Sequence, residues 1–133
     1  MTDTPSASAR PAPDRELGFL LVDAVRLMRR DFHGRARGLN LTPALARLVY
    51  NVHRTPGSRQ SELAARLEVT PATLGRMVDR LVDRGYVRRV ADATDRRAFR
   101  VHLERGGEAL IKRMDDIRAL TTARALLGLA DHE

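Results

Sequence analysis

The stretch between Val69 and Gly85 carries both the start and the stop signals of a helix, and it constrains the rest of the chain most. Thr70 suits the N-cap position, and Pro71 suits the first helical position because its φ is already fixed and no N–H donor is needed there. Gly85 closes the segment with a residue that readily adopts the left-handed conformation. Apolar side chains recur at helical spacing along one side, namely Leu74, Met77, Val78, Leu81 and Val82. The pattern predicts a capped, amphipathic helix.

The opposite face of this helix carries polar and small residues: Ala72, Thr73, Arg76, Asp79, Arg80 and Asp83. Short side chains in the first turn let a helix start approach the base edges of DNA, and arginines farther along reach guanine or phosphate. A charged outer face is also common on ordinary surface helices. The neighbouring segments decide between these two interpretations.

Two further helices are predicted before this one. Thr42-Pro43 repeats the cap-and-proline start, and apolar spacing continues to about residue 54. Thr55-Pro56-Gly57 is a turn signal, after which residues 58–67 predict a third, short helix. Two short helices joined by a tight turn, the second one capped and bearing arginines, indicate a helix-turn-helix at about residues 58–85.

Two β-prone segments follow, at residues 86–90 and 99–104. The second, Phe-Arg-Val-His-Leu-Glu, alternates apolar and polar side chains with a period of two. The link between them is polar and has arginines near its tip. We expect two antiparallel strands that form a wing at about residues 86–104.

Broad apolar faces flank this lobe on both sides. Residues 14–37 predict one long helix and residues 107–128 another, with Gly106-Gly107 breaking the strand and Gly128 ending the last helix. Such faces usually contact two neighbours, one of which is expected to be a second subunit, so both helices are predicted to serve dimerisation. Residues 1–13 are rich in Ser, Thr, Ala and Pro and predict a flexible tail. The predicted fold class is mainly α with a small β wing (α+β), in one domain at residues 14–133.

The net charge of the chain limits the classes of partner that it is expected to bind. It has 24 basic and 17 acidic residues, a net charge of +7, and Lys112 is its only lysine. Arginine suits bidentate contacts to phosphate and guanine, and a strongly basic balance favours nucleic acid or an anionic membrane surface. No apolar run reaches the length of a membrane span and no signal peptide is recognisable, so we expect a cytoplasmic protein with no membrane partner.

The residues indicate binding rather than catalysis. The chain has no cysteine, which excludes disulfides, thiolate zinc sites and thiol-based redox sensing. No nucleophile–base set, phosphate-binding loop or pair of metal ligands is recognisable, and isolated histidines such as His102 are more often ordinary surface residues. We predict no enzyme, no metal site and no cofactor.

The order of the motifs resembles one known family. Five short motifs carry the likeness: Ser61-Glu62-Leu63-Ala64, Thr70-Pro71-Ala72-Thr73, Asp79-Arg80-Leu81, Arg84-Gly85 and Asp92-x-x-Asp95-Arg96-Arg97. From about Asp14 onward, this arrangement is similar to the winged-helix core of the MarR family of transcription regulators. The resemblance implies that the capped helix enters the major groove of DNA. It also implies that a wing-tip arginine enters the minor groove, whose negative potential attracts arginine.

The residues implied to contact DNA lie on the capped helix and at the wing tip: Thr70, Ala72, Thr73, Arg76, Arg80, Arg96 and Arg97. By position Arg97 is the expected minor-groove residue, and Arg96 is the alternative. Asp95 is expected to support the wing by holding either the hairpin or the guanidinium group. Gly75 departs from the family, which tends to carry a side chain there, and would either permit close approach of the backbone to DNA or mark a helix that is ordered only on binding.

The resemblance also implies an assembly and a ligand. Family members dimerise by interlacing the first helix with the last two, so we expect a homodimer on a pseudo-palindromic duplex. Residues 129–133 resemble the start of one further helix, so we expect a weaker dimer than in relatives that have that helix. A small aromatic or anionic effector is implied between the dimer helices and the lobe, with Arg29, His33, Tyr50 and His53 as candidates. Each candidate also fits an ordinary helix face.

These features predict a sequence-specific regulator of transcription that binds double-stranded DNA, and specifically a repressor released by a small-molecule effector. The alternative is an architectural or RNA-binding basic module without an effector. Base readout by Arg76 distinguishes the two, because an architectural module has no need of it.

Overall fold

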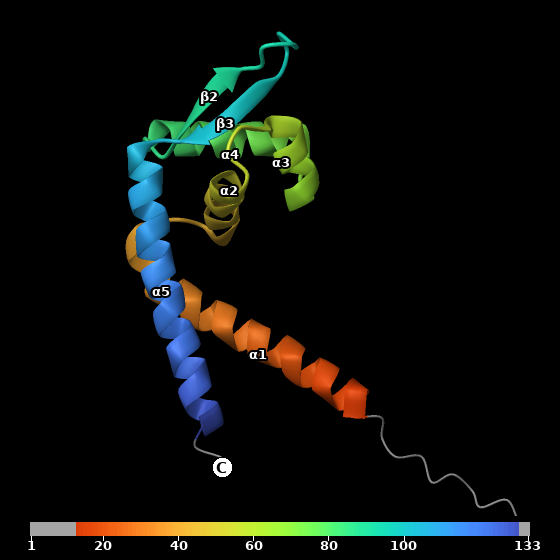
Figure 1. The fold of residues 1–133 in the computed structure, drawn as a ribbon, viewed down its shortest axis with the longest axis vertical. Helices are drawn as coiled ribbons and strands as arrows, with labels where there is room; N and C mark the ends of the chain where they lie inside the picture. Colours follow the sequence, from red (N-terminus) through yellow and green to blue (C-terminus); the bar gives the residue numbers. More distant parts are fainter. Residues whose placement is uncertain (1–12, 131–133) are drawn as a thin grey trace, which may run out of the picture.

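The computed structural model of the protein describes residues 13–130, with side chains described for residues 16–127. Three helices and a small sheet form a lobe, from which two longer helices extend as diverging legs (Figure 1). The elements in chain order are α1 (Pro13–Arg35), the 3-10 helix η1 (Ala36–Leu39), α2 (Pro43–Arg54), β1 (Ser58–Arg59), α3 (Gln60–Leu67), α4 (Pro71–Asp83), β2 (Val87–Ala91), β3 (Phe99–Leu103) and α5 (Arg105–Ala130). The predicted fold class, mainly helical with a small β wing, is confirmed.

The core of the lobe forms around α2. The Thr42 side chain caps this helix by accepting the Leu45 N–H at 3.2 Å, and Pro43 is the first helical residue. The predicted apolar stripe is at most 2% exposed and consists of Leu45, Leu48, Val49 and Val52. These side chains belong to one cluster with apolar residues of α3, α4, β2, β3 and α5. Burying a side chain of this size stabilises a fold by roughly 1.5–3 kcal/mol, so the cluster holds the elements of the lobe together.

The connection between α3 and α4 is as short as predicted. Glu68 ends α3 with a φ of 55°, in the left-handed region, and the Val69 N–H donates to the Ala64 carbonyl at 3.0 Å. The prediction for the start of α3 was wrong, because Ser58 and Arg59 are extended and pair with β3. Periodicity could not reveal β1, since a strand of two residues has no period of its own.

The ends of α4 match the signals in the sequence. The Thr70 side chain accepts the Thr73 N–H at 3.1 Å, and Pro71 occupies the first helical position. At the other end Gly85 has a φ of 74°, and its N–H donates to the Val82 carbonyl at 2.9 Å. These contacts satisfy backbone groups that a helix end would otherwise leave without partners.

The inward face of α4 is narrower than predicted. Leu74, Val78 and Leu81 are completely buried, and Met77 is partly buried. Val82 was expected on the same stripe but is 37% exposed. Successive helix residues are about 100° apart, so Val82 lies on the flank of a stripe centred on the three buried residues.

The wing is a three-stranded antiparallel sheet in the order β1-β3-β2, rather than the expected pair of strands. Val87, Arg89 and Ala91 pair with Leu103, Val101 and Phe99, respectively. Paired residues of antiparallel strands point to the same side, so these six side chains share one face. Val87 and Val101 are at most 2% exposed, which shows that this face lies against the helices.

Both ends of α5 differ from the prediction. Gly106 and Gly107 do not break a strand, since they lie in the first turn of the helix. A Cβ on Gly107 would lie 2.1 Å from the Tyr86 carbonyl oxygen, so glycine is needed where the helix backbone passes the segment before β2. The helix also continues past Gly128 through residues 129–130, because one glycine costs a helix only about 1 kcal/mol relative to alanine. Residues 131–133 lie outside the described part of the chain.

The legs cross near η1 and diverge toward their outer ends (Figure 1). Asp31 of α1 joins them, because its carboxylate accepts hydrogen bonds from Thr121 at 3.0 Å and Arg124 at 3.3 Å, both on α5. Of the tail expected at residues 1–13, only Pro13 lies within the described residues, and it begins α1. Large apolar side chains are exposed along both legs: Leu17, Phe19, Leu20, Leu21, Val22, Val25 and Leu27 on α1, and Leu120, Leu126 and Leu127 on α5.

Candidate nucleic-acid interface

The first turns of α4 present polar groups on the outside of the lobe. The Thr70 hydroxyl donates to the Thr73 hydroxyl at 2.9 Å and accepts the Thr73 N–H at 3.1 Å. Arg76 is exposed one turn later, with Nη2 3.5 Å from the same Thr73 hydroxyl. Ala72 and Arg80 are exposed on the same side of the helix. The structure therefore brings the five helix residues predicted to contact DNA onto one side of α4, with Thr70, Ala72 and Thr73 at the positive end of the helix dipole and Arg80 in the last turn.

Asp92 closes the base of the wing loop. Its side chain is 1% exposed, accepts a hydrogen bond from Nε of Arg59 at 2.9 Å and forms an ion pair with Arg100, whose Nε lies 2.9 Å from Oδ2. It also accepts the Thr94 N–H at 2.9 Å and the Thr94 hydroxyl at 2.8 Å. The hydrogen bonds from Thr94, followed by the guanidinium groups of Arg59 and Arg100, hold the pKa of Asp92 well below its ordinary value. Sequence reasoning included Asp92 in a motif but assigned it no role.

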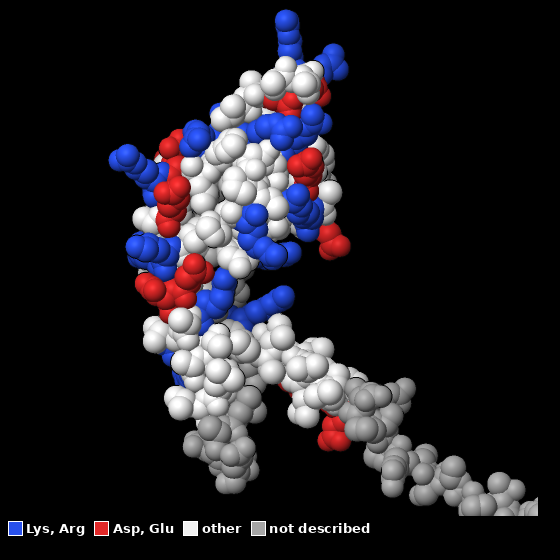
Figure 2. Space-filling model, in the orientation of Figure 1, with Lys and Arg blue, Asp and Glu red and all other residues white. Residues whose placement is uncertain are grey.

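The wing tip presents two exposed arginines, Arg96 and Arg97. Asp95 accepts the Arg97 N–H at 3.0 Å through its side chain and the Ala98 N–H at 3.1 Å through its carbonyl. Asp95 was predicted to hold either the hairpin or a guanidinium group, and these two hydrogen bonds are of the first kind. Figure 2 shows basic side chains extending from the end of the wing into open space.

Arg89 of β2 makes contacts that sequence reasoning missed. Its Nε donates to Gln60 Oε1 at 2.6 Å, its Nη2 donates to the Gly75 carbonyl at 3.0 Å, and its Nη1 lies 2.6 Å from Asp79 Oδ1. The side chain is 26% exposed. A signal was available, because Arg89 occupies an inward-facing position of a strand whose neighbours on that face are apolar.

Most of the excess positive charge lies on the lobe. Residues 39–104 contain 12 arginines and seven acidic residues, so five of the seven net charges belong to them. On the face seen in Figure 2, the described outer parts of the legs are mostly uncharged. The lobe therefore has the charge balance of a nucleic-acid-binding surface.

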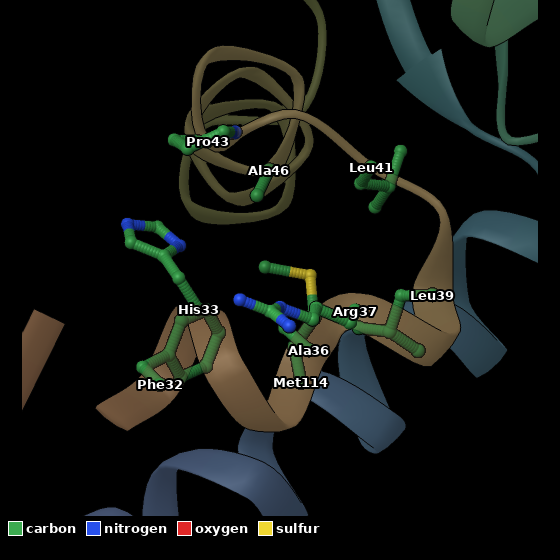
Figure 3. Close-up of a pocket in the computed structure, with 9 residues that line it drawn as sticks. All are labelled: Phe32, His33, Ala36, Arg37, Leu39, Leu41, Pro43, Ala46 and Met114. Carbon is green, nitrogen blue, oxygen red and sulfur yellow. The ribbon is translucent and has the colours of Figure 1, made fainter. Parts of the chain in front are cut away.

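The four predicted effector residues are not all part of the lining of one pocket. His33 lines a pocket of about 250 Å³ between α1, η1, α2 and α5 (Figure 3), with Phe32, Ala36, Arg37, Leu39, Leu41, Pro43, Ala46 and Met114. Arg29 lies farther out along α1, beside Val25. Tyr50 and His53 lie on α2, where the Arg118 guanidinium is 4.4 Å from the centre of the Tyr50 ring. Sequence reasoning did not name Arg37, the second basic residue of the pocket.

Within residues 13–130, no cluster of three or more His, Asp or Glu side chains is placed to hold a metal ion. Across the same range, no helix combines the length and the hydropathy that a membrane span requires.

A tight helix-turn-helix, an exposed and capped second helix, and an arginine-tipped wing on one lobe define a winged-helix protein of the kind that binds DNA. The sequence model of the MarR family matches residues 39–98, from the end of η1 through the wing loop. Together with the solved structures described next, this match shows that the chain is similar to the MarR family, and a fold of this kind supports DNA-binding regulation of transcription.

Solved structures of family members are similar over most of the chain. A crystal structure of MarR is 29% identical, covers 88% of this chain and 83% of its own, and superposes with a TM-score of 0.68. Wild-type MarR from E. coli in its apo form is 25% identical, with coverages of 84% and 83% and a TM-score of 0.77. The transcriptional regulator Tm0710 from Thermotoga maritima shares the fold at 24% identity, with coverages of 86% and 81% and a TM-score of 0.75.

Proposed function

We propose that this chain is a homodimeric, sequence-specific regulator that places α4 of each protomer in the major groove of double-stranded DNA and each wing tip in an adjacent minor groove. The observation that carries the proposal is the ordered, exposed first turn of α4 on the same lobe as an arginine-tipped wing. The contacts among Thr70, Thr73 and Arg76 fix that turn in the free protein. Less side-chain freedom is then lost on binding, which favours affinity.

Each proposed contact follows from the chemistry of the groove that it enters. Ala72 leaves room for close approach, and Arg76 has the planar fork that bonds guanine O6 and N7 together. Arg80, one turn farther along α4, suits a phosphate. At the wing tip, Arg97 suits a narrow, A·T-rich minor groove because the negative potential is strongest there, and Arg96 is the alternative.

The legs supply the dimer in this proposal. A single lobe reads half a site, and discrimination normally comes from two lobes about one helical turn of DNA apart, roughly 34 Å. A hollow of about 930 Å³ between α1 and α5, lined by Leu27, Met28 and Leu126 among others, is open in the single chain. Exposed apolar surface of this kind marks a protein–protein contact, and the proposal assigns it to a leg of a second copy. A homodimer on a pseudo-palindromic duplex follows.

Binding should be tested with the duplex that lies next to the chain's own gene, a random duplex of equal length, and an RNA hairpin. We expect the first duplex to bind at least about a thousandfold more tightly than the random duplex at physiological salt. Equal affinity for both duplexes, or preference for the RNA, would favour the architectural or RNA-binding alternative. The proposal places the protein in the cytoplasm together with its DNA.

We also propose that the protein represses transcription and that a small aromatic anion releases it, with the pocket beside His33 and Arg37 as the binding site. In Figure 3 both side chains extend from the α1–η1 segment into the space below Pro43 and Ala46 of α2. The pocket is small and largely apolar, with basic groups at one side, which suits a single aromatic ring with a carboxylate. Benzoate is a suitable probe: it should weaken DNA binding by the wild type, and Arg37→Gln should require higher benzoate concentrations. DNA binding that is insensitive to benzoate and to related aromatic carboxylates would contradict this part of the proposal.

A further inference from the structure

We propose that Arg89 is a positioning residue that fixes the wing against α4, so that the two DNA-contacting parts bind as one rigid unit. The inference rests on the proposed function, because it concerns the two elements that are placed in the DNA grooves. It assigns Arg89 no contact with DNA, although Arg89 is a basic residue within the DNA-binding lobe.

The Arg89 side chain connects three segments of the lobe, and we call this set of contacts the tie. Each of its three guanidinium nitrogens has a separate partner: Gln60 at the start of α3, and the Gly75 carbonyl and the Asp79 carboxylate on α4. Its backbone belongs to β2, which continues into the wing loop. One side chain therefore connects the wing to both helices of the helix-turn-helix.

A phosphate contact is the obvious alternative role for an arginine in this lobe. The charge of Arg89 is already offset by Asp79 at 2.6 Å, and the side chain lies on the inward face of the sheet at 26% exposure. The neighbouring Arg88 differs on each point, since it lies on the other face of β2, is 50% exposed and has Glu104 only at 3.9 Å. Of the two, Arg88 is the more exposed and has the longer ion pair, and its Nη1 donates to the Leu103 carbonyl on the neighbouring strand at 2.9 Å.

Asp79 gives the tie a second consequence. It lies on the outer face of α4, 60% exposed, where an unpaired carboxylate would repel the phosphates of a bound duplex. Arg89 offsets this charge and directs the Asp79 carboxylate toward the sheet. The contact with the Gly75 carbonyl, one turn earlier, holds the middle of α4 at a fixed distance from β2.

The decisive comparison is Arg89→Lys, because it keeps the charge and removes the geometry. A lysine ammonium is a single point charge, whereas three partners in different directions require the planar fork of a guanidinium group. The set of variants is Arg89→Lys and Arg89→Gln, with Arg88→Gln as the matched control that removes one charge from the same strand. The probes are a duplex selected from a random-sequence pool by the wild-type protein and an unselected duplex of equal length.

We expect Arg89→Lys and Arg89→Gln each to weaken binding to the selected duplex about tenfold, the size expected for loss of hydrogen bonds to a charged group. Binding to the unselected duplex should change much less, so the ratio of the two affinities falls. Loss of folded protein alone would lower both affinities alike and leave that ratio unchanged. The dependence of binding on salt should be the same for Arg89→Lys and the wild type, because no phosphate contact is lost.

Two results would overturn the proposal. If Arg89→Lys binds the selected duplex as well as the wild type does, a point charge is sufficient and Arg89 acts on phosphate. If Arg89→Gln loses no more than Arg88→Gln, the tie has no effect on DNA binding. Should Arg89→Gln fail to fold, Asp79→Asn removes the ion pair from the helix side and should show the same fall in the affinity ratio.

Failure of the proposed function is distinguishable from failure of this inference. If the wild type enriches no duplex from the pool, the DNA-binding proposal fails by itself. The tie is then tested by hydrogen exchange of the β2 amides, which should be faster in Arg89→Lys than in Arg88→Gln at equal global stability. Equal exchange in the two variants would overturn the positioning role of Arg89.

Discussion

Arg59, the residue immediately before α3, donates a 2.9 Å hydrogen bond from Nε to the buried carboxylate of Asp92, 33 residues later in the chain. Arg100 of β3 forms an ion pair with the same carboxylate from the opposite strand of the wing. The start of the helix-turn-helix and the base of the wing loop are therefore tied to one side chain.

Replacing Asp92 with Asn should destabilise the lobe at neutral pH. The pKa of Asp92 is lowered in the folded protein, so its contribution to stability is complete above about pH 5 and is lost as the pH falls below the unfolded value of about 3.9 toward the lower folded pKa. The urea midpoints of wild type and Asp92→Asn should therefore differ clearly at pH 7, and the difference should be smaller at pH 2.5. Asp115→Asn, which removes an exposed carboxylate next to Arg118, is the control and should change little at either pH. A gap between wild type and Asp92→Asn that widens as the pH falls would contradict this explanation.

Arg76→Ala should remove a base contact. We expect a loss of about 1–3 kcal/mol on the specific duplex and relaxed preference at one base pair in each half-site. Fluorescence anisotropy on the specific duplex and on single-base variants of it measures both effects. Arg113→Ala, an exposed arginine of α5, is the control and should leave the base preference unchanged. If Arg76→Ala weakens specific and random duplexes equally, Arg76 contacts phosphate only.

Arg97→Ala should weaken binding most on duplexes with A·T-rich flanks. The slope of log affinity against log salt should decrease by about one unit, since one phosphate-region charge is lost. Arg96→Ala, at the adjacent tip position, should have a smaller effect on the flank preference. The reverse order would exchange the roles of Arg96 and Arg97, and unchanged binding by both variants would mean that the tip is free of DNA.

Leu21→Glu should weaken the dimer by placing a charge on the exposed apolar face of α1, where Leu21 is 57% exposed in the single chain. Light scattering over a dilution series should show monomer at concentrations where the wild type is dimeric. Val90→Glu changes a similarly exposed apolar residue on the wing and should leave the dilution curve unaltered. Identical curves for Leu21→Glu and the wild type would place the interface elsewhere.

Two glycines should respond to alanine in opposite directions. Gly75→Ala should raise the free energy of unfolding by roughly 0.5–1 kcal/mol, because nothing lies within 4 Å of the added Cβ and the helix gains propensity. Gly107→Ala should lower it by about 1–3 kcal/mol, since its Cβ would collide with the Tyr86 carbonyl. Urea titration measures both. If Gly75 allows close approach to DNA, the more stable Gly75→Ala variant should bind DNA less tightly than the wild type.

The sequence was most informative where the structure depends on neighbouring residues. The cap at Thr70, the proline at the first helical position and the left-handed Gly85 are local signals, and all three have the expected conformations. The apolar spacing of α2 and α4 identified their buried faces for the same reason, since periodicity is a property of a continuous segment. Only the edge residue Val82 was misplaced.

The remaining features depend on contacts between distant segments. β1 exists because Ser58 meets Val101 across the sheet, and no pattern within residues 58–59 records that pairing. The glycines at the start of α5 resemble a strand breaker until the Tyr86 carbonyl is placed beside them. The effector candidates were chosen by residue type, whereas the pocket around His33 is assembled from four separate elements. Its lining could not be inferred without the crossing of α1 and α5.

The 26 residues of α5 connect the sheet of the lobe directly to the outer end of one leg. At 1.5 Å per residue the helix is about 39 Å long, so a rotation of about 5° at its base moves its far end by about 3 Å. In the proposed dimer, which is held together at the legs, the same rotation of α5 would move one lobe relative to the other lobe by a comparable distance. Small changes in packing near η1, where the pocket beside His33 lies, are thereby converted into changes in the distance between two lobes that must match one turn of DNA.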